Sequence, residues 1–208
     1  MNHSFSIVSI PIVALGDSTT AGTPFFESPL EAPPDGRGEP RGAYGYWLMQ
    51  AHPEWTVLNR GVNGERSDQI AARFDRDVIA AKPAAVVIIA GVNDVYQGRP
   101  ASAVTTMLRG MYDRAARASL PVVAGSIVPY NSATPDQNAA MHEINAWIAR
   151  QATTDLRLQY VDTRKAAAKD GQIDLLAGSP DGLHPDIDGY HRMANAIAPA
   201  LERVLPKR

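Results

Sequence analysis

The sequence of 208 residues contains no cysteine. This absence excludes a disulfide framework, a zinc site built from thiolates and a cysteine nucleophile. An excess of charge of one sign is also lacking, because 20 Lys and Arg residues stand against 22 Asp and Glu residues, for a formal net charge of −2. The chain therefore has no basic face that could neutralise a row of phosphates. We expect no nucleic-acid partner and a small molecule as the substrate.

Long apolar runs are absent as well. No segment approaches the roughly 18 apolar residues that a membrane-spanning helix needs. The apolar run at 5–15 is short, contains Pro11, lacks a basic leader and is not followed by a small-residue cleavage pattern. It therefore fits a first strand better than a signal peptide. These features predict a cytoplasmic protein without a membrane span, and they leave the oligomeric state open.

Strand and helix patterns alternate along the chain. Short apolar runs rich in β-branched residues predict strands at 7–15, 56–58, 85–90, 122–126 and 158–161. Composition and period predict helices at 44–51, 68–81, 101–119, 137–152 and 187–204. Because consecutive parallel strands need long connections, this alternation predicts an α/β fold, with one domain over 1–208 built as a three-layer α/β/α sandwich around a mostly parallel sheet. The continuous apolar run at 86–89 is typical of a central strand.

Two irregular segments interrupt this pattern. The longer one, at 22–42, contains five prolines and the adjacent residues Phe25 and Phe26, a composition that excludes a regular helix or strand. Long loops in compact domains are often functional, so we expect a lid-like insertion or pocket wall here, with a solvated insertion as the alternative. The second segment, at 128–136, is expected to form another wall of the same cleft. Phe25, Phe26 and Tyr130 indicate an apolar acyl pocket.

Four polar, glycine-bearing segments follow predicted strands. They lie at 16–19, 59–64, 91–94 and 181–184. In a parallel sheet the loops that leave the carboxyl ends of the strands gather at one edge, where ligands of open α/β sheets bind. The topology therefore brings a serine, a histidine, a carboxylate and several amide donors to one place, and this is the set of groups that acyl transfer needs.

Within these segments, Ser18, Asp181 and His184 are the candidate catalytic residues. Ser18 lies at a strand-to-helix turn, where the helix N-terminus offers N–H groups to a developing oxyanion; a helix-capping role is the alternative. Asp181 precedes His184 by three residues, so its carboxylate can accept from Nδ1 of the imidazole and leave Nε2 free to take the serine proton. An ordinary surface loop is the alternative for this pair.

Asn93 and Gly64 are candidate oxyanion donors. Asn93 follows the most apolar strand, where a carboxamide would face the cleft, and Asp94 could orient its loop. Gly64 would let a substrate approach its backbone N–H closely. A turn asparagine and a glycine with positive φ are the alternatives. His3, His52, His142 and His191 are interpreted as structural or solvated residues, and Met107 and Met111 as core residues.

These blocks, in this order, resemble the four blocks of the SGNH hydrolase superfamily, also called the GDSL esterases and lipases. The serine matches Ser18, the glycine Gly64, the asparagine Asn93 and the histidine His184. Thr19 stands where the GDSL name has leucine, and Gly61 is a competitor for Gly64. The resemblance implies a flavodoxin-like fold of five strands in the order 2-1-3-4-5. It also implies an oxyanion hole formed by the N–H groups of Ser18 and Gly64 and the side chain of Asn93, without a metal or organic cofactor.

The expected activity is hydrolysis of carboxylic esters through an acyl-enzyme intermediate, on a short- to medium-chain acyl ester. A carbohydrate O-acetylesterase, a thioesterase and a lysophospholipase are alternatives from the same superfamily. Two more distant alternatives are a non-catalytic flavodoxin-like binding module and a magnesium-assisted phosphohydrolase with Asp17 as nucleophile. The candidate substrate-binding residues are Asp17, Phe25, Phe26 and Tyr130.

Overall fold

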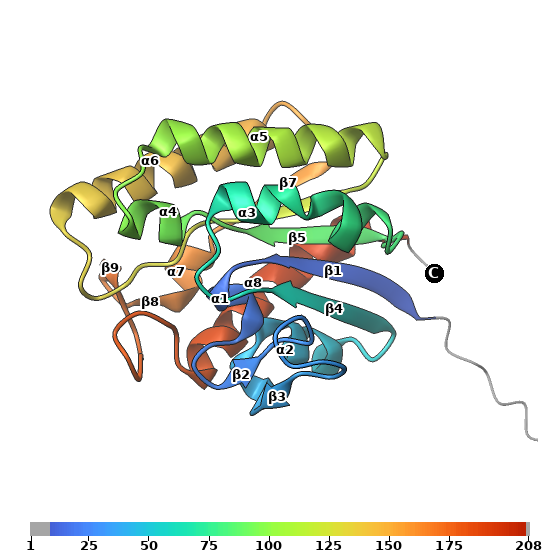
Figure 1. The fold of residues 1–208 in the computed structure, drawn as a ribbon, viewed down its shortest axis with the longest axis horizontal. Helices are drawn as coiled ribbons and strands as arrows, with labels where there is room; N and C mark the ends of the chain where they lie inside the picture. The colour runs from blue at the N-terminus through green and yellow to red at the C-terminus, as the bar shows by residue number, and fades with distance from the viewer. Residues whose placement is uncertain (1–8, 207–208) are drawn as a thin grey trace, which may run out of the picture.

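A parallel five-stranded sheet forms the centre of the molecule (Figure 1). The computed structural model describes residues 9–206. The strands of this sheet are β1 (Ile10–Gly16), β4 (Trp55–Gly61), β5 (Ala85–Ile89), β6 (Val122–Gly125) and β7 (Leu158–Val161), in the order β4-β1-β5-β6-β7. Counted in chain order within the sheet alone, this is 2-1-3-4-5. The expected α/β class is confirmed, and the most apolar run is the middle strand.

Helices cover both faces of the sheet. One face carries α3 (Ser67–Ala72), α5 (Ala101–Arg117) and α6 (Pro135–Ala152), and the other carries α2 (Tyr44–Ala51) and α8 (Ile187–Val204). Side chains of a strand point alternately to the two faces. Accordingly, Val86 and Ile88 of β5 belong to the core under α3, α5 and α6, whereas Val87 and Ile89 belong to the core under α2 and α8.

The segment at 22–42 is more regular than its composition suggested. It contains the two-residue strands β2 (Phe26–Glu27) and β3 (Arg37–Gly38), which pair antiparallel, and the 3-10 helix η1 (Pro40–Gly42). Four of its five prolines lie outside these short elements, and Pro40 begins η1, which helps to keep the elements short. Ser28 Oγ donates to the carbonyl of Gly61 (2.6 Å), and Glu31 accepts from the backbone N–H of Asn63 (2.8 Å). The segment is therefore bound to the end of β4 and the loop that follows it.

The sequence predicts one continuous helix at 68–81, and this prediction is wrong. The α-helix α3 ends at Ala72, and a π-helix, η2 (Asp75–Ile79), follows it. Arg73 stands at the break, and its guanidinium is hydrogen-bonded to groups outside the helix. Tertiary contacts of one side chain thus override the helical period of the sequence.

Several short elements were not predicted. They are α4 (Val92–Tyr96), α7 (Thr163–Ala167), β8 (Ala168–Lys169) and β9 (Gln172–Leu176). The helix expected to begin at Ser18 is present as the short α1 (Ser18–Ala21). The first strand begins at Ile10 instead of residue 7, and residues 7 and 8 lie outside the described part. Within residues 9–206, no helix is long and apolar enough to cross a bilayer.

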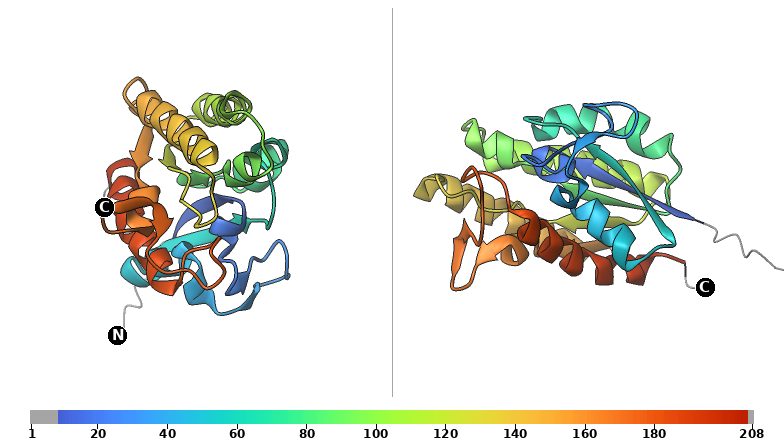
Figure 2. Two further views of the ribbon diagram at one scale, coloured as in Figure 1. Left: turned by 90° about the vertical axis from the view of Figure 1, so that its left-hand side faces the viewer. Right: turned by 90° about the horizontal axis from the view of Figure 1, so that it is seen from below.

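The carboxyl ends of the strands point to one side of the molecule. The left panel of Figure 2 looks onto this side, where the segment before α8 passes close to the start of α1. This edge of the sheet holds the candidate site.

Candidate active site

The turn between β1 and α1 presents Ser18. Gly16 ends the strand, and a Cβ atom there would overlap Oγ1 of Thr20 and the carbonyl oxygen of Ile89, so only glycine fits this close approach. Asp17 is the N-cap of α1 and accepts from the N–H of Thr19 (2.9 Å). The side-chain hydroxyl of Ser18 is therefore not used for capping, and Ser18 itself is 6% exposed.

The loop before α8 presents His184. One carboxylate oxygen of Asp181 accepts from the backbone N–H groups of Leu183 (2.9 Å) and His184 (2.8 Å). The other lies 2.7 Å from Nδ1 of His184. Ser179 Oγ donates to the carbonyl of His184 (2.6 Å). Both the backbone and the ring of His184 are therefore fixed by neighbours within the same loop.

A hydrogen bond between His184 and Ser18 joins these two loops. Nε2 of His184 lies 2.9 Å from Oγ of Ser18. Because the Asp181 carboxylate accepts from Nδ1–H, Nε2 carries no proton in the neutral ring and can accept one from Ser18. The structure thus brings Ser18, His184 and Asp181 together in the order expected from the sequence.

The pKa of the Asp181 carboxyl is about 2, below its ordinary value of 3.8. Partial burial is the largest single influence and raises the pKa, but it is outweighed by the hydrogen bonds from the His184 side chain and from the backbone N–H groups of His184 and Leu183, which lower it. Asp181 is therefore ionised throughout the neutral range and can orient the imidazole.

The pKa of the Asp17 carboxyl is shifted in the opposite direction, above its ordinary value. Asp17 is 1% exposed, its Oδ2 atom is buried without a hydrogen-bond partner among the described residues, and burial raises its pKa from 3.8 to about 7. The nearby charge of Asp94 also raises it, while the hydrogen bonds from Thr19 and the charge of Arg73 lower it. A carboxyl so enclosed is a helix cap, and its burial supports neither the expected contact with substrate nor the alternative in which Asp17 attacks phosphorus.

The candidate oxyanion donors also lie at this edge. Gly64 has φ +73°, and a Cβ atom there would meet no atom within 4 Å, so the space beside its Cα is open. Gly61, the competitor, is packed so tightly that a Cβ atom would overlap the backbone nitrogen of Ala21. The side chain of Asn93 donates one N–H to the carbonyl of Glu65 (2.9 Å).

These donors retain unused hydrogen-bonding capacity. Among residues 9–206, neither the N–H of Ser18 nor that of Gly64 donates to another protein group, and the Asn93 carboxamide uses one of its two N–H bonds. Asp94 accepts from both the backbone N–H (2.7 Å) and the hydroxyl (2.9 Å) of Ser67. It therefore joins α4 to the start of α3.

The expected apolar pocket residues lie elsewhere. Phe25 packs against Gly42 and the core under α2 and α8. Phe26 lines a pocket of about 400 Å³ between the 22–42 segment, α2 and β4, which includes neither Ser18 nor His184. Tyr130 is 1% exposed and belongs to the core under α5 and α6. The sequence showed that these rings are apolar, but their direction depends on packing.

The segment at 128–136 contacts the loop that carries His184. The backbone N–H of Asn131 donates to the carbonyl of Gly182 (2.7 Å), and its side chain accepts from the N–H of Leu176 (2.9 Å). The segment after β6 therefore supports the loop that carries Asp181 and His184.

Three of the other histidines and the two methionines lie away from the hydrogen bonds that join Ser18, His184 and Asp181. His52 stacks on Trp55, His191 stacks on Trp47, and His142 pairs with Asp174. His3 lies outside the described residues. Met111 is buried in the core, and Met107 packs against it. Within residues 9–206, no group of three or more His, Asp or Glu side chains is arranged to hold a metal ion.

Sequence reasoning missed Arg73 and Glu65. Arg73 is 7% exposed and is hydrogen-bonded to the carbonyl of Gly16, two residues before Ser18. The available signal was an arginine between Ile70 and Phe74, on the apolar side of a helical pattern, with an aspartate four residues later. A charge at such a position needs buried partners.

Comparison with known proteins identifies the family. A sequence model described as the GDSL-like lipase/acylhydrolase family matches residues 14–192. The chain belongs to this family. The match includes all four polar blocks at the carboxyl edge of the sheet, and it makes the chain an ester hydrolase.

Relatives of this GDSL-family hydrolase include an acetylxylan esterase of Geobacillus stearothermophilus, which is 28% identical over 171 residues, covering 74% of this chain and 77% of the relative. A solved structure of a G-D-S-L family protein from Desulfitobacterium hafniense matches with a TM-score of 0.74 at 23% identity, over 95% of this chain and all of that one. A catalytic mutant of an acetylxylan esterase from Geobacillus stearothermophilus matches with a TM-score of 0.71 at 23% identity, over 96% of this chain and 97% of that one. At these identities the structures support the fold alone.

Proposed function

We propose that this GDSL-family ester hydrolase works through Ser18 as nucleophile, His184 as general base and Asp181 as the group that orients His184. The observation that carries the proposal is the hydrogen-bonded chain from Ser18 Oγ to His184 Nε2 (2.9 Å) and from His184 Nδ1 to Asp181 (2.7 Å). This chain is the arrangement that activates a serine hydroxyl, because the proton leaves Oγ as the oxygen attacks.

In the first half-reaction, Ser18 Oγ bonds to the carbonyl carbon of the ester while His184 takes the Ser18 proton. The negative charge on the carbonyl oxygen is held by the N–H groups of Ser18 and Gly64 and by the free N–H of Asn93. When the bond between carbon and the alcohol oxygen breaks, His184 gives its proton to the departing alcohol. The acyl group is then esterified to Ser18.

In the second half-reaction, water attacks the acyl carbon and His184 takes a proton from that water. The same donors hold the second oxyanion. The bond from the acyl carbon to Ser18 Oγ then breaks, His184 returns the proton to Oγ, and the carboxylic acid is released. The free enzyme is restored without an external reductant, oxidant or metal.

For the substrate, we propose short acyl esters, with acetylated saccharides as the first class to test. The similarity to an acetylxylan esterase favours acetyl esters of sugars. Longer acyl esters and thioesters are the alternatives.

The test combines a labelling experiment with a substrate panel. A phosphonate inhibitor loses its leaving group when Ser18 Oγ attacks phosphorus, so the mass of its phosphonyl group should be added to the peptide that carries Ser18 and to no other peptide. Ser18→Ala should abolish both labelling and turnover while the circular dichroism spectrum and melting temperature stay close to those of the wild type. Turnover by Ser18→Ala at the wild-type rate would overturn the proposed nucleophile.

The substrate panel comprises 4-nitrophenyl esters from acetate to octanoate and acetylated xylo-oligosaccharides, with acetate release as the readout. A kcat/KM that is highest for acetate and for the acetylated saccharides supports the proposed substrate class. A kcat/KM that rises with chain length would contradict it and favour the lipase or thioesterase alternative.

A further inference from the structure

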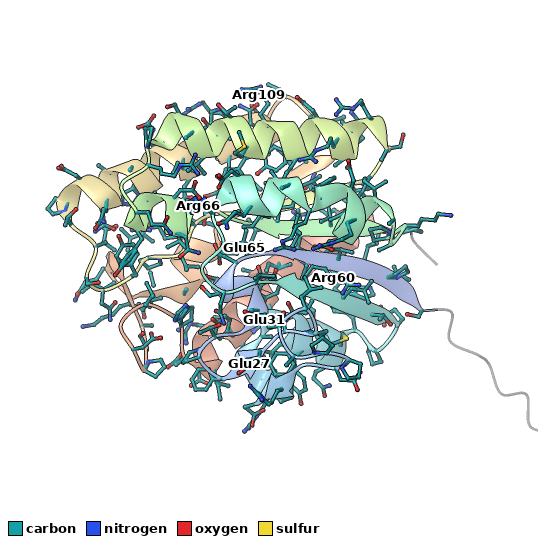
Figure 3. All side chains as sticks on the ribbon, viewed as in Figure 1. Glu27, Glu31, Arg60, Glu65, Arg66 and Arg109 are labelled. Atoms are coloured by element: carbon teal, nitrogen blue, oxygen red, sulfur yellow. The ribbon has the colours of Figure 1, made fainter. Side chains whose placement is uncertain are left out.

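One buried guanidinium joins several parts of the active-site edge. The Nη2 atom of Arg73 donates to the carbonyl of Gly16 (2.8 Å), Nη1 donates to the carbonyl of Arg60 (2.8 Å) and to Asp77 (2.8 Å), and Nε donates to Glu65 (2.6 Å). Figure 3 labels Arg60 at the end of β4 and Glu65 in the following loop. Arg73 therefore connects the ends of two neighbouring strands with the loop that leaves one of them.

These contacts come at the cost of a regular helix. Arg73 ends α3, and the chain continues into the π-helix η2 instead of completing the α-helix that the sequence pattern predicts. Such π-helical turns occur often at functional sites. Burying a positive charge is unfavourable unless it is paired, and Glu65 and Asp77 supply the pairing. The local sequence is thus arranged to hold this guanidinium at the ends of β1 and β4.

Two of these contacts, to Gly16 and to Glu65, lead to the proposed oxyanion donors. Gly16 lies two residues before Ser18. Glu65 directly follows Gly64, so its ion pair with Arg73 holds the residue next to the second donor. The carbonyl of the same Glu65 accepts from Asn93, the third donor (2.9 Å).

We propose that Arg73 is a positioning residue that fixes the relative placement of the three oxyanion donors, an inference that rests on the proposed function. The guanidinium is planar and has five N–H donors in a fixed geometry, so it can hold carbonyls and carboxylates from separate segments in one arrangement. A lysine carries the same charge but cannot span these acceptors. Since the donors act on the oxyanion of the transition state, their misplacement should lower kcat and leave KM almost unchanged.

The test compares two arginine-to-lysine variants with 4-nitrophenyl acetate as substrate. Arg73→Lys should lower kcat by on the order of 100-fold, with KM within about threefold of the wild type. The matched control is Arg114→Lys, because Arg114 also donates to a helix carbonyl, that of Ala71 (2.7 Å), and lies over Phe74, yet it contacts no residue of the site. This control should change the melting temperature and leave kcat within about twofold.

A second pair of variants covers the outcome in which Arg73→Lys does not fold. Glu65→Ala removes the carboxylate that Nε contacts but keeps the carbonyl that holds Asn93, and it should lower kcat by about 10-fold with KM unchanged. Glu65→Gln keeps an oxygen for Nε and should recover most of this loss. The rate of inactivation by diethyl 4-nitrophenyl phosphate should fall in parallel with kcat, because phosphorylation of Ser18 uses the same donors.

The outcomes separate the two proposals. If the wild type turns over substrate and kcat is unchanged in folded Arg73→Lys or in Glu65→Ala, the positioning role is overturned and the proposed function is left intact. A loss of kcat in Arg73→Lys no greater than that in Arg114→Lys also overturns it. An inactive wild type that phosphonates do not label overturns the proposed function and the positioning role with it.

Discussion

His184 and Ser18 are 166 positions apart in the chain, and their side chains lie 2.9 Å apart at the carboxyl edge of the sheet. The contact joins the first turn after β1 to the last loop before α8. No local interaction along the sequence could produce it, so the geometry of the site depends on the whole sheet being formed.

Removing the charge that orients His184 should slow turnover without unfolding the protein. In Asp181→Asn the side-chain amide can donate to Nδ1, which favours the tautomer with its proton on Nε2, where it cannot accept from Ser18. We expect kcat to fall by on the order of 1,000-fold or more, with little change in KM. Steady-state kinetics will measure this. A kcat within tenfold of the wild type would remove Asp181 from the mechanism.

The pH dependence of activity should show an acid limb set by the imidazole. His184 must be neutral to accept the Ser18 proton, whereas the pKa of Asp181 is about 2, so Asp181 stays ionised down to strongly acidic solution. A profile of log kcat/KM against pH should therefore fall with a slope of one on the acid side. A slope of two would show that a second group must also lose a proton, and a midpoint below pH 4 would indicate that a carboxyl group controls the limb.

Asp17 should make the protein less stable as the pH rises. Burial raises the pKa of Asp17 from 3.8 to about 7 in the folded state, so the folded protein binds more protons than the unfolded chain between these values. The free energy of unfolding then falls with increasing pH across this window. Asp17→Asn cannot ionise, so its stability relative to the wild type should increase from pH 5 to pH 8, by on the order of a few kcal/mol. Thermal or urea unfolding at the two pH values will measure the difference.

The control for this prediction is another N-cap aspartate. Asp186 caps α8, accepts from the N–H of Gly189 (2.7 Å) and is partly exposed. A solvated carboxylate at a helix N-terminus is favourable, so Asp186→Asn should lose stability at pH 8. If Asp17→Asn also loses stability at pH 8, the Asp17 carboxylate is stabilised by contacts that outweigh its burial.

The two glycines of the second block should respond differently to alanine. In Gly61→Ala the new methyl group would overlap the backbone of Ala21, so α1 must move, and the variant should lose about 1–3 kcal/mol or more of stability together with activity. In Gly64→Ala the methyl group enters open space at φ +73°, so the stability cost should be only about 1 kcal/mol. Its kinetic effect should exceed what this small destabilisation explains. Equal effects of both variants on stability would contradict the packing described for Gly61.

Asn93 should contribute to catalysis more than to stability. Asn93→Ala removes one oxyanion donor and should lower kcat by on the order of 100-fold to 1,000-fold. It also removes the hydrogen bond to the Glu65 carbonyl, which should cost about 1 kcal/mol in unfolding free energy. An unchanged kcat would place the oxyanion hole elsewhere.

Much of the fold was predictable because the hydrophobic pattern depends on residues that are close together in the sequence. The apolar run at 86–89 identified the buried middle strand, and the alternation of strands with helices identified a parallel sheet. The break at Arg73 could not be predicted, because the carbonyls of Gly16 and Arg60 that hold its guanidinium come from distant parts of the chain. The directions of Phe26 and Tyr130 were missed for the same reason.

By itself, the sequence determined the chemical groups available to this protein and the edge of the sheet at which they gather. Residue type fixes the chemistry of Ser18, Asp181 and His184, and the alternation of strands with helices follows from patterns that neighbouring residues create. Only the tertiary structure decided that Ser18 and His184 share a hydrogen bond, that Asp17 is buried and that Arg73 links three segments of the site. Distances, burial and pKa values depend on atoms that lie far apart in the chain, and they exist only once the chain has packed.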